Sequence, residues 1–308
     1  MFDPTQLAAL SAILRNGSFE RAARVLGLTQ SAVSQRIRLL EEQVGTPLII
    51  RAQPCRATEA GARVFRHAEE LRLLEQELRT DLGIGRELGA LASGGTGADA
   101  RGWPAVRVAV NADSLATWFL PALAAAGGLL FDLVVDDQDH SADWLKRGEV
   151  RAAISSASRP VQGCDCRPLG ALRYLATASP AFCRRWFGEE GVTPAGLQRA
   201  PMLTFNAKDR LQSRWAEQAF GASLAGPSHW LPSSQAFVDA AAAGLGWGMN
   251  PEALAAPALA DGRLMVLKAD CPLDVPLYWH VSRSVQRLMQ PVTRAVVEAA
   301  RRALKPVL

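Results

Sequence analysis

Apolar residues between positions 18 and 44 recur at the spacing of two short helices joined by a tight turn. In the second helix, Val33, Ile37 and Leu40 fall at i, i+4 and i+7, which places them on one inward face. Gly27 stands between the two helices, where a left-handed residue commonly ends a helix. The pattern predicts a helix-turn-helix, whose second helix can enter the major groove of DNA.

Polar residues on the other face of this unit are candidate DNA contacts. Ser18 and Thr29 stand at expected N-cap positions, because their hydroxyls can accept from free backbone N–H groups. Gln can pair with adenine, Arg with guanine, and Ser or Thr with phosphate or several bases. The alternative is an ordinary pair of packed helices with a solvated face. The expected DNA-binding residues are Ser18, Thr29, Gln30, Ser31, Ser34, Gln35, Arg36 and Arg38, with Arg51 and Arg56 from the segment that follows.

The distribution of charge favours the DNA-binding interpretation. Residues 1–66 hold nine Arg and five acidic residues, a net charge of +4. The whole chain, with 34 basic and 30 acidic residues, has the same net charge of +4. All the excess positive charge therefore lies with the suspected DNA-reading unit, as phosphate contacts require.

A small β-wing and a long helix are expected after the helix-turn-helix. Leu48, Ile49 and Ile50 are β-prone, and prolines flank the turn that follows within residues 45–57. From Thr58 onward, apolar residues recur at three- and four-residue steps over more than four turns. A stripe of this length fits a helix that pairs with its copy in a dimer, the alternative being packing on its own chain. The stripe consists of Val64, Ala68, Leu71, Leu74, Leu78 and Leu82.

Glycines between positions 83 and 97 mark a hinge, beyond which strands alternate with helices. The βαβαβ order over residues 105–155 implies a parallel sheet, and a second such set follows. Two lobes with a cleft between them are typical of proteins that close on a small ligand. We expect an α/β chain with a winged helix-turn-helix domain at 1–58, a linker helix and hinge at 59–102, and a two-lobed, periplasmic-binding-protein-like effector domain at 103–308. Lobe I is expected at about 103–160 and 272–308, and lobe II at about 161–271.

Composition narrows the class of protein. No apolar run approaches the roughly 20 residues of a membrane span, and no apolar signal segment follows Asp3, so we expect a cytoplasmic protein without a membrane partner. The five cysteines, odd in number and irregularly spaced, indicate free thiols. We expect no metal and no cofactor. The chain lacks G-x-S-x-G, a phosphate-binding loop and H-E-x-x-H, so we do not expect an enzyme.

Candidate ligand residues lie where predicted strands end. The segment from Asn111 to Leu115 leads from a strand into a helix, whose free N–H groups attract a carboxylate. Acidic residues after the second strand suit a Lys ammonium or an Arg guanidinium. The alternatives are helix capping by Asp113 or Ser114, a solvated acidic loop, and a core role for Phe205. The expected effector-binding residues are Asp113, Ser114, Leu115, Asp137, Gln138, Ser155, Thr204, Phe205 and Asp239.

The chain resembles the LysR-type transcriptional regulators over nearly its full length. The resemblance rests on F-E-R-A-A-x-x-L followed by T-Q-S-A-V-S-Q-R-I-x-x-L-E in the helix-turn-helix, on the linker helix and on the two lobes. Within the family the chain is similar to the ArgP/LysG-type subgroup, which controls basic amino-acid export. The supporting segments are 54–61, 108–123, 170–182, 205–209, 232–249 and 274–280.

The resemblance implies a partner, an oligomer and an effector. It implies a homodimer or homotetramer that binds double-stranded DNA and responds to Lys or Arg, with Ser114 at the position that typically grips the effector. Effector binding would shift the two lobes relative to each other and so change the spacing of the paired DNA-reading heads. That change would decide whether RNA polymerase is recruited. The regulated gene would serve transport, export or amino-acid metabolism.

Other interpretations stay open from the sequence. One is a LysR-type regulator with a different effector. Another is an architectural DNA binder or replication inhibitor with little sequence preference, which a steep salt dependence and a small ratio of specific to nonspecific affinity would favour. The absence of a catalytic signature argues against an α/β enzyme, and the DNA-reading head argues against a plain solute-binding protein.

Overall fold

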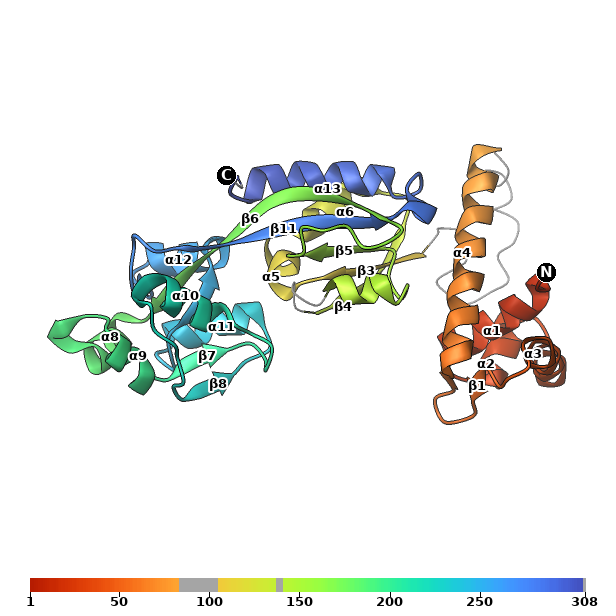
Figure 1. The fold of residues 1–308 in the computed structure, drawn as a ribbon, viewed down its shortest axis with the longest axis horizontal. Coiled ribbons are helices and arrows are strands. Elements are labelled where there is room, and N and C mark those ends of the chain that lie inside the picture. Colours follow the sequence, from red (N-terminus) through yellow and green to blue (C-terminus); the bar gives the residue numbers. More distant parts are fainter. Residues whose placement is uncertain (83–104, 137–140, 307–308) are drawn as a thin grey trace. The chain divides into compact units, whose positions relative to one another are not determined.

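The structure, a computed structural model, describes residues 1–82, 105–136 and 141–306. The chain forms an N-terminal unit of helices with a small wing and a C-terminal α/β unit, each described by itself (Figure 1). The predicted hinge at 83–97 lies outside the described residues.

Three helices form the predicted helix-turn-helix and its support: α1 (Pro4–Asn16), α2 (Phe19–Leu26) and α3 (Gln30–Val44). Ser18 and Thr29 are the N-caps of α2 and α3, as predicted, and Gly27 ends α2 with a left-handed φ of 65°. The inward face of α3 is fully buried, because Val33, Ile37 and Leu40 are at most 1% exposed. The local capping and periodicity signals therefore predict these helices correctly.

The predicted wing consists of β1 (Ile49–Ile50) and β2 (Arg56–Ala57), which pair antiparallel. The Glu41 carboxylate on α3 fixes the wing, because its Oε1 accepts from the backbone N–H of Leu48 at 2.7 Å and of Ile49 at 3.3 Å. The long helix α4 (Glu59–Asp81) packs closely behind the wing at Gly61. A Cβ atom at Gly61 would lie 1.8 Å from the carbonyl oxygen of Leu48, so only glycine fits there.

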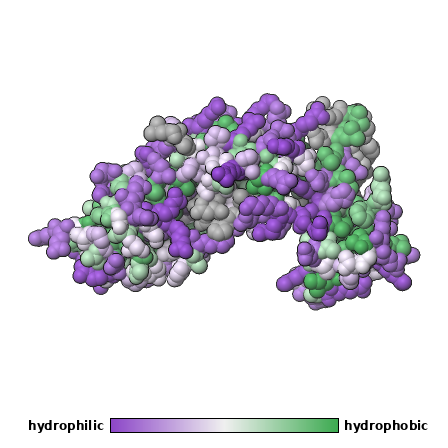
Figure 2. Space-filling model, viewed as in Figure 1, coloured by the Kyte–Doolittle hydropathy of each residue, from purple (hydrophilic) through white to green (hydrophobic). Residues whose placement is uncertain are grey.

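The apolar stripe of α4 changes its environment along the helix. Val64 and Ala68 join the core of the N-terminal unit. The later members are exposed, from 38% at Leu71 to 62% at Leu82, and hydrophobic residues gather along α4 in Figure 2. Packing on its own chain therefore accounts for the start of the stripe, whereas Leu71, Leu74 and Leu78 of α4, and Leu82 just after it, are exposed.

Lobe I of the C-terminal unit contains the predicted β3 (Ala105–Val110), β4 (Leu130–Val135) and β5 (Ala152–Ser155). β3 and β5 run parallel, as predicted. The predicted helix after β3 is one helical stretch with a π-helical turn inside it. In Figure 1, α6 and α13 lie along the same side of the sheet. The helices of lobe I are α5 (Ala112–Ser114), the π turn Leu115–Phe119, α6 (Leu120–Ala126), α7 (Ser141–Lys146) and α13 (Gln290–Ala303).

Two long antiparallel strands, β6 (Cys164–Ala178) and β11 (Leu273–Ser282), run through both lobes. Their register shifts between Leu277 and Tyr278. The strand order of the main sheet is β10-β6-β11-β5-β3-β4, and β9 also pairs with β6. The part of β6 before Tyr174 was not predicted, because Pro168 and Gly170 read locally as turn residues, whereas pairing with β11 keeps them extended.

Lobe II surrounds the far ends of these strands. β7 (Met202–Thr204) and β8 (Ser228–Trp230) form a separate parallel pair. β9 (Gly248–Pro251) and β10 (Met265–Val266) extend the main sheet, and β10, α9 and α12 were not predicted from the sequence. The helices of lobe II are α8 (Pro180–Trp186), α9 (Pro194–Arg199), α10 (Leu211–Phe220), α11 (Ser234–Ala242) and α12 (Glu252–Ala260).

Three further observations bear on the expected chemistry. All five cysteines are free, as the sequence predicts. Across the described ranges, no helix has the length and apolar composition to cross a bilayer. The same residues contain no cluster of three or more His, Cys, Asp or Glu side chains arranged to hold a metal ion.

Candidate functional site

The free face of α3 presents the side chains that the sequence predicts as DNA contacts. Gln30, Ser31, Gln35 and Arg38 are exposed, whereas Ser34 and Arg36 are half-buried. Arg38 forms an ion pair with Glu42 one turn away, with Nε 2.9 Å from Oε1. A surface pair of this kind is weak, so the guanidinium can turn to another acceptor at little cost.

The two capping hydroxyls position the helices. Thr29 Oγ1 accepts from the backbone N–H of Ala32 at 3.2 Å and lies 3.0 Å from Ser31 Oγ. Ser18 Oγ accepts from the N–H of Arg21 at 3.4 Å. Ser18 and Thr29 therefore have an observed capping role, and a DNA contact by either stays a prediction.

The wing brings two further cations to the exposed surface of this unit. The Arg51 guanidinium lies 5.1 Å from the centre of the Phe19 ring, a cation–π contact that joins the wing to the start of α2. Arg56 is exposed in β2, opposite Ile50. The predicted phosphate-binding residues are thus accessible, on a unit with a net positive charge.

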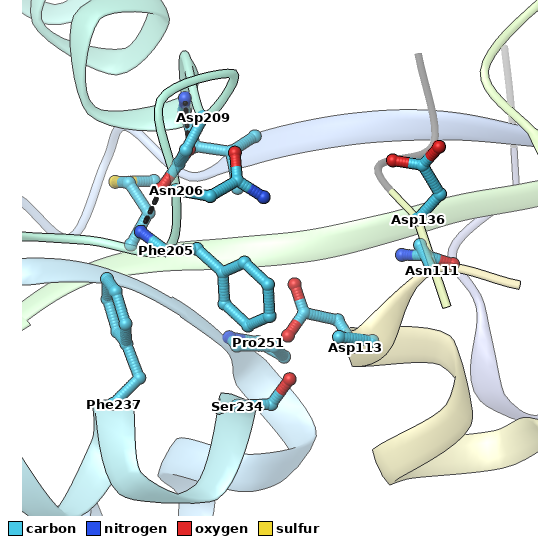
Figure 3. Close-up of a pocket in the computed structure, with 12 residues that line it drawn as sticks. Asn111, Asp113, Asp136, Phe205, Asn206, Asp209, Ser234, Phe237 and Pro251 are labelled. Carbon is cyan, nitrogen blue, oxygen red and sulfur yellow. Dashed lines mark hydrogen bonds between the residues drawn. The ribbon is translucent and has the colours of Figure 1, made fainter. Parts of the chain in front are cut away.

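A pocket lies between the two lobes of the C-terminal unit (Figure 3). It encloses about 510 Å³ of space free of protein atoms, and this figure includes space open to solvent. Lobe I contributes residues from the ends of β3 and β4, and lobe II contributes the β7–α10 loop, α11 and β9. The lining residues are Asn111, Ala112, Asp113, Asp136, Phe205, Asn206, Asp209, Leu211, Ser234, Phe237, Met249 and Pro251.

Asp113 is the buried carboxylate of this pocket. Burial raises its pKa, and the nearby charge of Asp209 raises the pKa further, while Ser234 and Tyr174 oppose the shift. The Tyr174 phenol donates to Asp113 Oδ2 at 2.7 Å. Burial thus favours the neutral form of this carboxyl group, and a cationic ligand beside it would stabilise the ionised form.

Asn111 supplies an unused amide at the same wall. The residue is 2% exposed, and neither Oδ1 nor Nδ2 has a hydrogen-bond partner among the described residues. It occupies the N-cap position of α5 without a capping hydrogen bond. A buried amide without partners is costly, so a polar ligand in the pocket would stabilise it.

The β7–α10 loop is held by its own polar side chains. Asp209 accepts from the backbone N–H groups of Phe205 at 2.9 Å and Leu211 at 3.0 Å, and from Gln212 Nε2 at 3.2 Å. Asn206 Oδ1 accepts from the N–H of Lys208 at 2.7 Å. The Asp209 carboxylate is thus engaged by the loop, in contrast to that of Asp113.

Two of the predicted effector-binding residues line this pocket, namely Asp113 and Phe205. Ser114 is fully buried and its Oγ has no hydrogen-bond partner within the described part, but it does not line the pocket. Leu115 begins the π turn. Thr204 is buried at the end of β7, also outside the lining.

The other predicted effector-binding residues lie elsewhere. Ser155 is buried, and its Oγ accepts from the N–H of Ala157 at 3.1 Å. Asp137 and Gln138 lie outside the described residues. Asp239 requires a correction: it is exposed and accepts from Gln235 Nε2 at 3.3 Å. The helical period explains this position, because the inward face of α11 is formed by Ser234, Phe237, Val238 and Ala241.

Sequence reasoning missed Asp209, Ser234 and Phe237, which also line the pocket. Asn111, Asp136 and Asn206 belong to the strand-end segments that the sequence indicated, although the expected set did not include them. Ser234 and Phe237 lie three residues apart on α11, and that spacing identifies a shared face without saying what it meets.

Comparison with known families assigns both units of the chain. Residues 4–62 match the family described as bacterial regulatory helix-turn-helix protein, lysR family. Residues 104–305 match the family described as LysR substrate binding domain.

Individual relatives match over nearly the full length. The HTH-type transcriptional regulator LysG of Mycobacterium tuberculosis (strain ATCC 25618 / H37Rv) is 43% identical over 97% of this chain and 93% of the relative. The regulator ArgP of Pseudomonas fluorescens (strain Pf0-1) is 41% identical over 100% of both chains.

Two solved structures share the fold along the whole chain. ArgP from Mycobacterium tuberculosis superposes with a TM-score of 0.81 at 41% identity, covering 100% of both chains. Full-length LysG from Corynebacterium glutamicum with bound effector Arg gives a TM-score of 0.69 at 36% identity, covering 99% of this chain and 100% of that one.

Proposed function

The chain belongs to the LysR family of bacterial helix-turn-helix regulators, and from that premise we propose that it regulates transcription in response to a basic amino acid. The N-terminal unit binds double-stranded DNA, and the pocket between the lobes takes Lys or Arg. The observation that carries the proposal is the buried carboxyl group of Asp113, which lines the pocket between the two lobes beside the unpartnered amide of Asn111.

DNA is read by the exposed side chains of α3. Gln30 and Gln35 offer amides suited to adenine, and Arg38 a guanidinium suited to guanine. Arg51 and Arg56 of the wing contact phosphates, which fixes the register of the protein on the duplex. Because its partner is genomic DNA, the protein acts in the bacterial cytoplasm.

Asp113 receives the cationic group of the effector. A cation that enters the pocket gains the attraction of a desolvated carboxylate, and Asn111 supplies a donor and an acceptor for the polar end of the same molecule. The Phe205 ring lies beside the Asp113 carboxylate in Figure 3 and offers an apolar wall for the side-chain stem. The bound Arg named for the Corynebacterium glutamicum LysG structure supports this assignment.

The exposed leucines of α4 make the protein a dimer through this helix. Leu71, Leu74, Leu78 and Leu82 follow three- and four-residue steps and are open to a second copy. Two such dimers form a tetramer, whose paired DNA-reading heads change spacing when the lobes move on the effector. This movement alters how RNA polymerase is recruited at a gene for amino-acid transport, export or metabolism. The chain acts as a regulator without an enzymatic step.

Calorimetric titration of the full-length protein with L-lysine, L-arginine and L-norleucine tests this proposal. Norleucine keeps the length of the lysine stem and lacks its ammonium group. We expect heat of binding from the two basic amino acids and none from norleucine, and loss of binding in Asp113→Asn.

Asp239→Asn is the matched control, because Asp239 is an exposed acidic residue of lobe II outside the pocket. Equal binding of norleucine, or an unchanged affinity in Asp113→Asn, would contradict the proposed effector class and its site.

A further inference from the structure

Lys208 and Asp136 form an ion pair from one lobe to the other. Lys208 Nζ, on the β7–α10 loop of lobe II, lies 3.2 Å from Asp136 Oδ1, just after β4 of lobe I. Asp136 lines the pocket opposite Asn206 and Asp209 (Figure 3). This contact therefore joins the two walls of the proposed effector site.

The two partners are held unequally. Asp136 Oδ2 accepts from Trp144 Nε1 at 2.8 Å, and the Trp144 ring is flanked by the guanidinium groups of Arg107 and Arg147, 5.9 and 4.8 Å from its centre. The side chain of Asp136 is 20% exposed, and that of Lys208 is 47% exposed. The carboxylate is thus a fixed acceptor, and the Lys208 ammonium is the half that can leave.

The loop delivers the Lys208 backbone to a defined place. Asn206 binds the N–H of Lys208, and Asp209 binds Phe205 and Leu211. The flexible four-carbon stem of Lys208 is then the main freedom that the ammonium retains. Departure from Asp136 thus requires rotation of one side chain, without rebuilding the loop.

A basic amino acid carries two cationic groups, and the pocket is lined by three acidic side chains. Asp209 is held by backbone N–H groups of its own loop. Asp113 accepts from the Tyr174 phenol, and Asp136 already holds a cation, the Lys208 ammonium. Asp136 can receive the second cation only if Lys208 gives it up.

We propose that Lys208 is a built-in competitor of the effector: its ammonium holds the lobes together over the empty pocket, and a cationic group of the effector displaces it from Asp136. This inference rests on the proposed function for the ligand class. Lys208 carries the same ammonium group as a lysine ligand, so the unliganded site contains its own stand-in for the effector side chain.

A double-mutant cycle without effector tests whether the Lys208–Asp136 ion pair stabilises the folded protein. Lys208→Met, Asp136→Asn and the double variant are compared in denaturant unfolding of the full chain. We expect the two substitutions to be coupled by about two- to fivefold in the unfolding equilibrium constant, the range of a partly exposed ion pair. The control cycle pairs Lys208→Met with Asp239→Asn and should be additive. Additive effects in the first cycle would show that the Lys208–Asp136 ion pair does not hold the lobes together.

Effector titration tests the competition. Lys208→Met should bind L-lysine and L-arginine about two- to fivefold more tightly, because the competing cation is gone. Lys208→Arg keeps a cation at this position and should retain the wild-type affinity. The control Lys146→Met removes an ammonium that pairs with Asp143 within α7 of lobe I and should change nothing.

These experiments distinguish failure of the proposed competition by Lys208 from failure of the proposed effector class. Unchanged or weaker binding in Lys208→Met overturns the competition, while wild-type binding still supports the proposed function. Absence of binding in the wild type refutes the proposed effector, and the double-mutant cycle then still decides whether Lys208 and Asp136 are coupled.

Discussion

Tyr174 donates its phenolic hydrogen to Asp113 Oδ2 over 2.7 Å and thereby ties β6 to the start of the helical stretch after β3. The phenol is 1% exposed, so the bond is shielded from water. A hydrogen bond to a carboxylate favours its ionised form, and the Tyr174 bond lowers a pKa that burial raises. Tyr174 thus favours the ionised form of a carboxyl group that burial disfavours.

Replacing Tyr174 with Phe should weaken the effector site. Asp113 loses a donor, its pKa rises further, and a neutral carboxyl attracts a cation poorly. We expect about a tenfold loss of affinity for L-arginine, the scale of one hydrogen bond to a charged group. Calorimetry measures this change, and the buried Phe182→Leu in α8, outside the pocket, controls for general loosening of lobe II. Unchanged affinity would remove Tyr174 from the account.

The raised pKa of Asp113 also sets a pH dependence. The folded state retains this proton to higher pH than the unfolded chain, whose carboxyl titrates near the usual 3.8. Between the two pKa values the folded state binds more protons, so the contribution of Asp113 to stability falls as pH rises through that window. We expect Asp113→Asn to stabilise the unliganded protein at neutral pH. Chemical denaturation across the pH range measures this, and an unchanged or lower stability of the variant would contradict it.

Effector affinity should have the opposite pH dependence. A cation binds the ionised carboxylate, so binding strengthens as pH rises through the folded pKa and releases a proton within that window. Titrations in two buffers of different ionisation enthalpy report the released proton. Proton uptake on binding of L-arginine would show that Asp113 is not the acceptor.

Local signals explain which parts of this structure the sequence could predict. The N-caps Ser18 and Thr29, the left-handed Gly27 and the spacing of Val33 to Leu40 are all read within 27 residues, and each takes the expected conformation. The pocket depends on contacts between distant segments. Asp113 and Tyr174 lie 61 positions apart, and Lys208 and Asp136 lie 72 apart.

Misplaced residues have equally physical causes. Asp239 stands near cleft residues in the sequence, but the period of α11 turns it outward. Gly170 reads as a turn residue, yet its φ of 133° is used inside β6, where the C-terminal residues Leu304 and Lys305 approach within 2.8 Å of an added Cβ. Helical periodicity determines the position of Asp239, whereas strand pairing and the approach of the C-terminal segment determine that of Gly170.

Sequence preference on DNA should depend on α3. Gln35→Ala and Arg38→Ala each remove a side chain suited to base edges, and we expect a cost of about 1–3 kcal/mol at the preferred site with little change on random duplex. Arg24→Ala is a matched control, because Arg24 is also an exposed arginine in an i,i+4 ion pair, with Glu20. Competition binding at constant salt measures the ratio, and unchanged ratios would argue against α3 as the reading helix.

The oligomer should depend on the exposed leucines of α4. Leu74→Asp places two charges in the proposed helix pair, one from each copy. The dimer also loses the burial of two leucines, which is worth about 3 kcal/mol or more. The dissociation constant should therefore rise at least about 100-fold. Leu245→Asp is the control, since Leu245 is 46% exposed against 43% for Leu74. Analytical ultracentrifugation distinguishes the species, and an intact wild-type assembly in Leu74→Asp would place the interface elsewhere.

The wing should depend on the close approach at Gly61. Gly61→Ala sets a methyl group against the Leu48 carbonyl, so α4 and the wing must separate. Overpacking of this kind costs about 1–3 kcal/mol and should weaken DNA binding through the displaced Arg51 and Arg56. Thermal unfolding and DNA titration measure the two effects. Arg63→Ala, on the exposed side of the same helix, should leave both near the wild type.

The most direct test of the account is selection of fragmented genomic DNA by the purified full-length protein, with sequencing of the bound fragments, in the absence and presence of L-lysine or L-arginine. We expect a small set of sites enriched over random duplex, with footprints that change when the amino acid is added. Equal recovery of all fragments under every condition would contradict it.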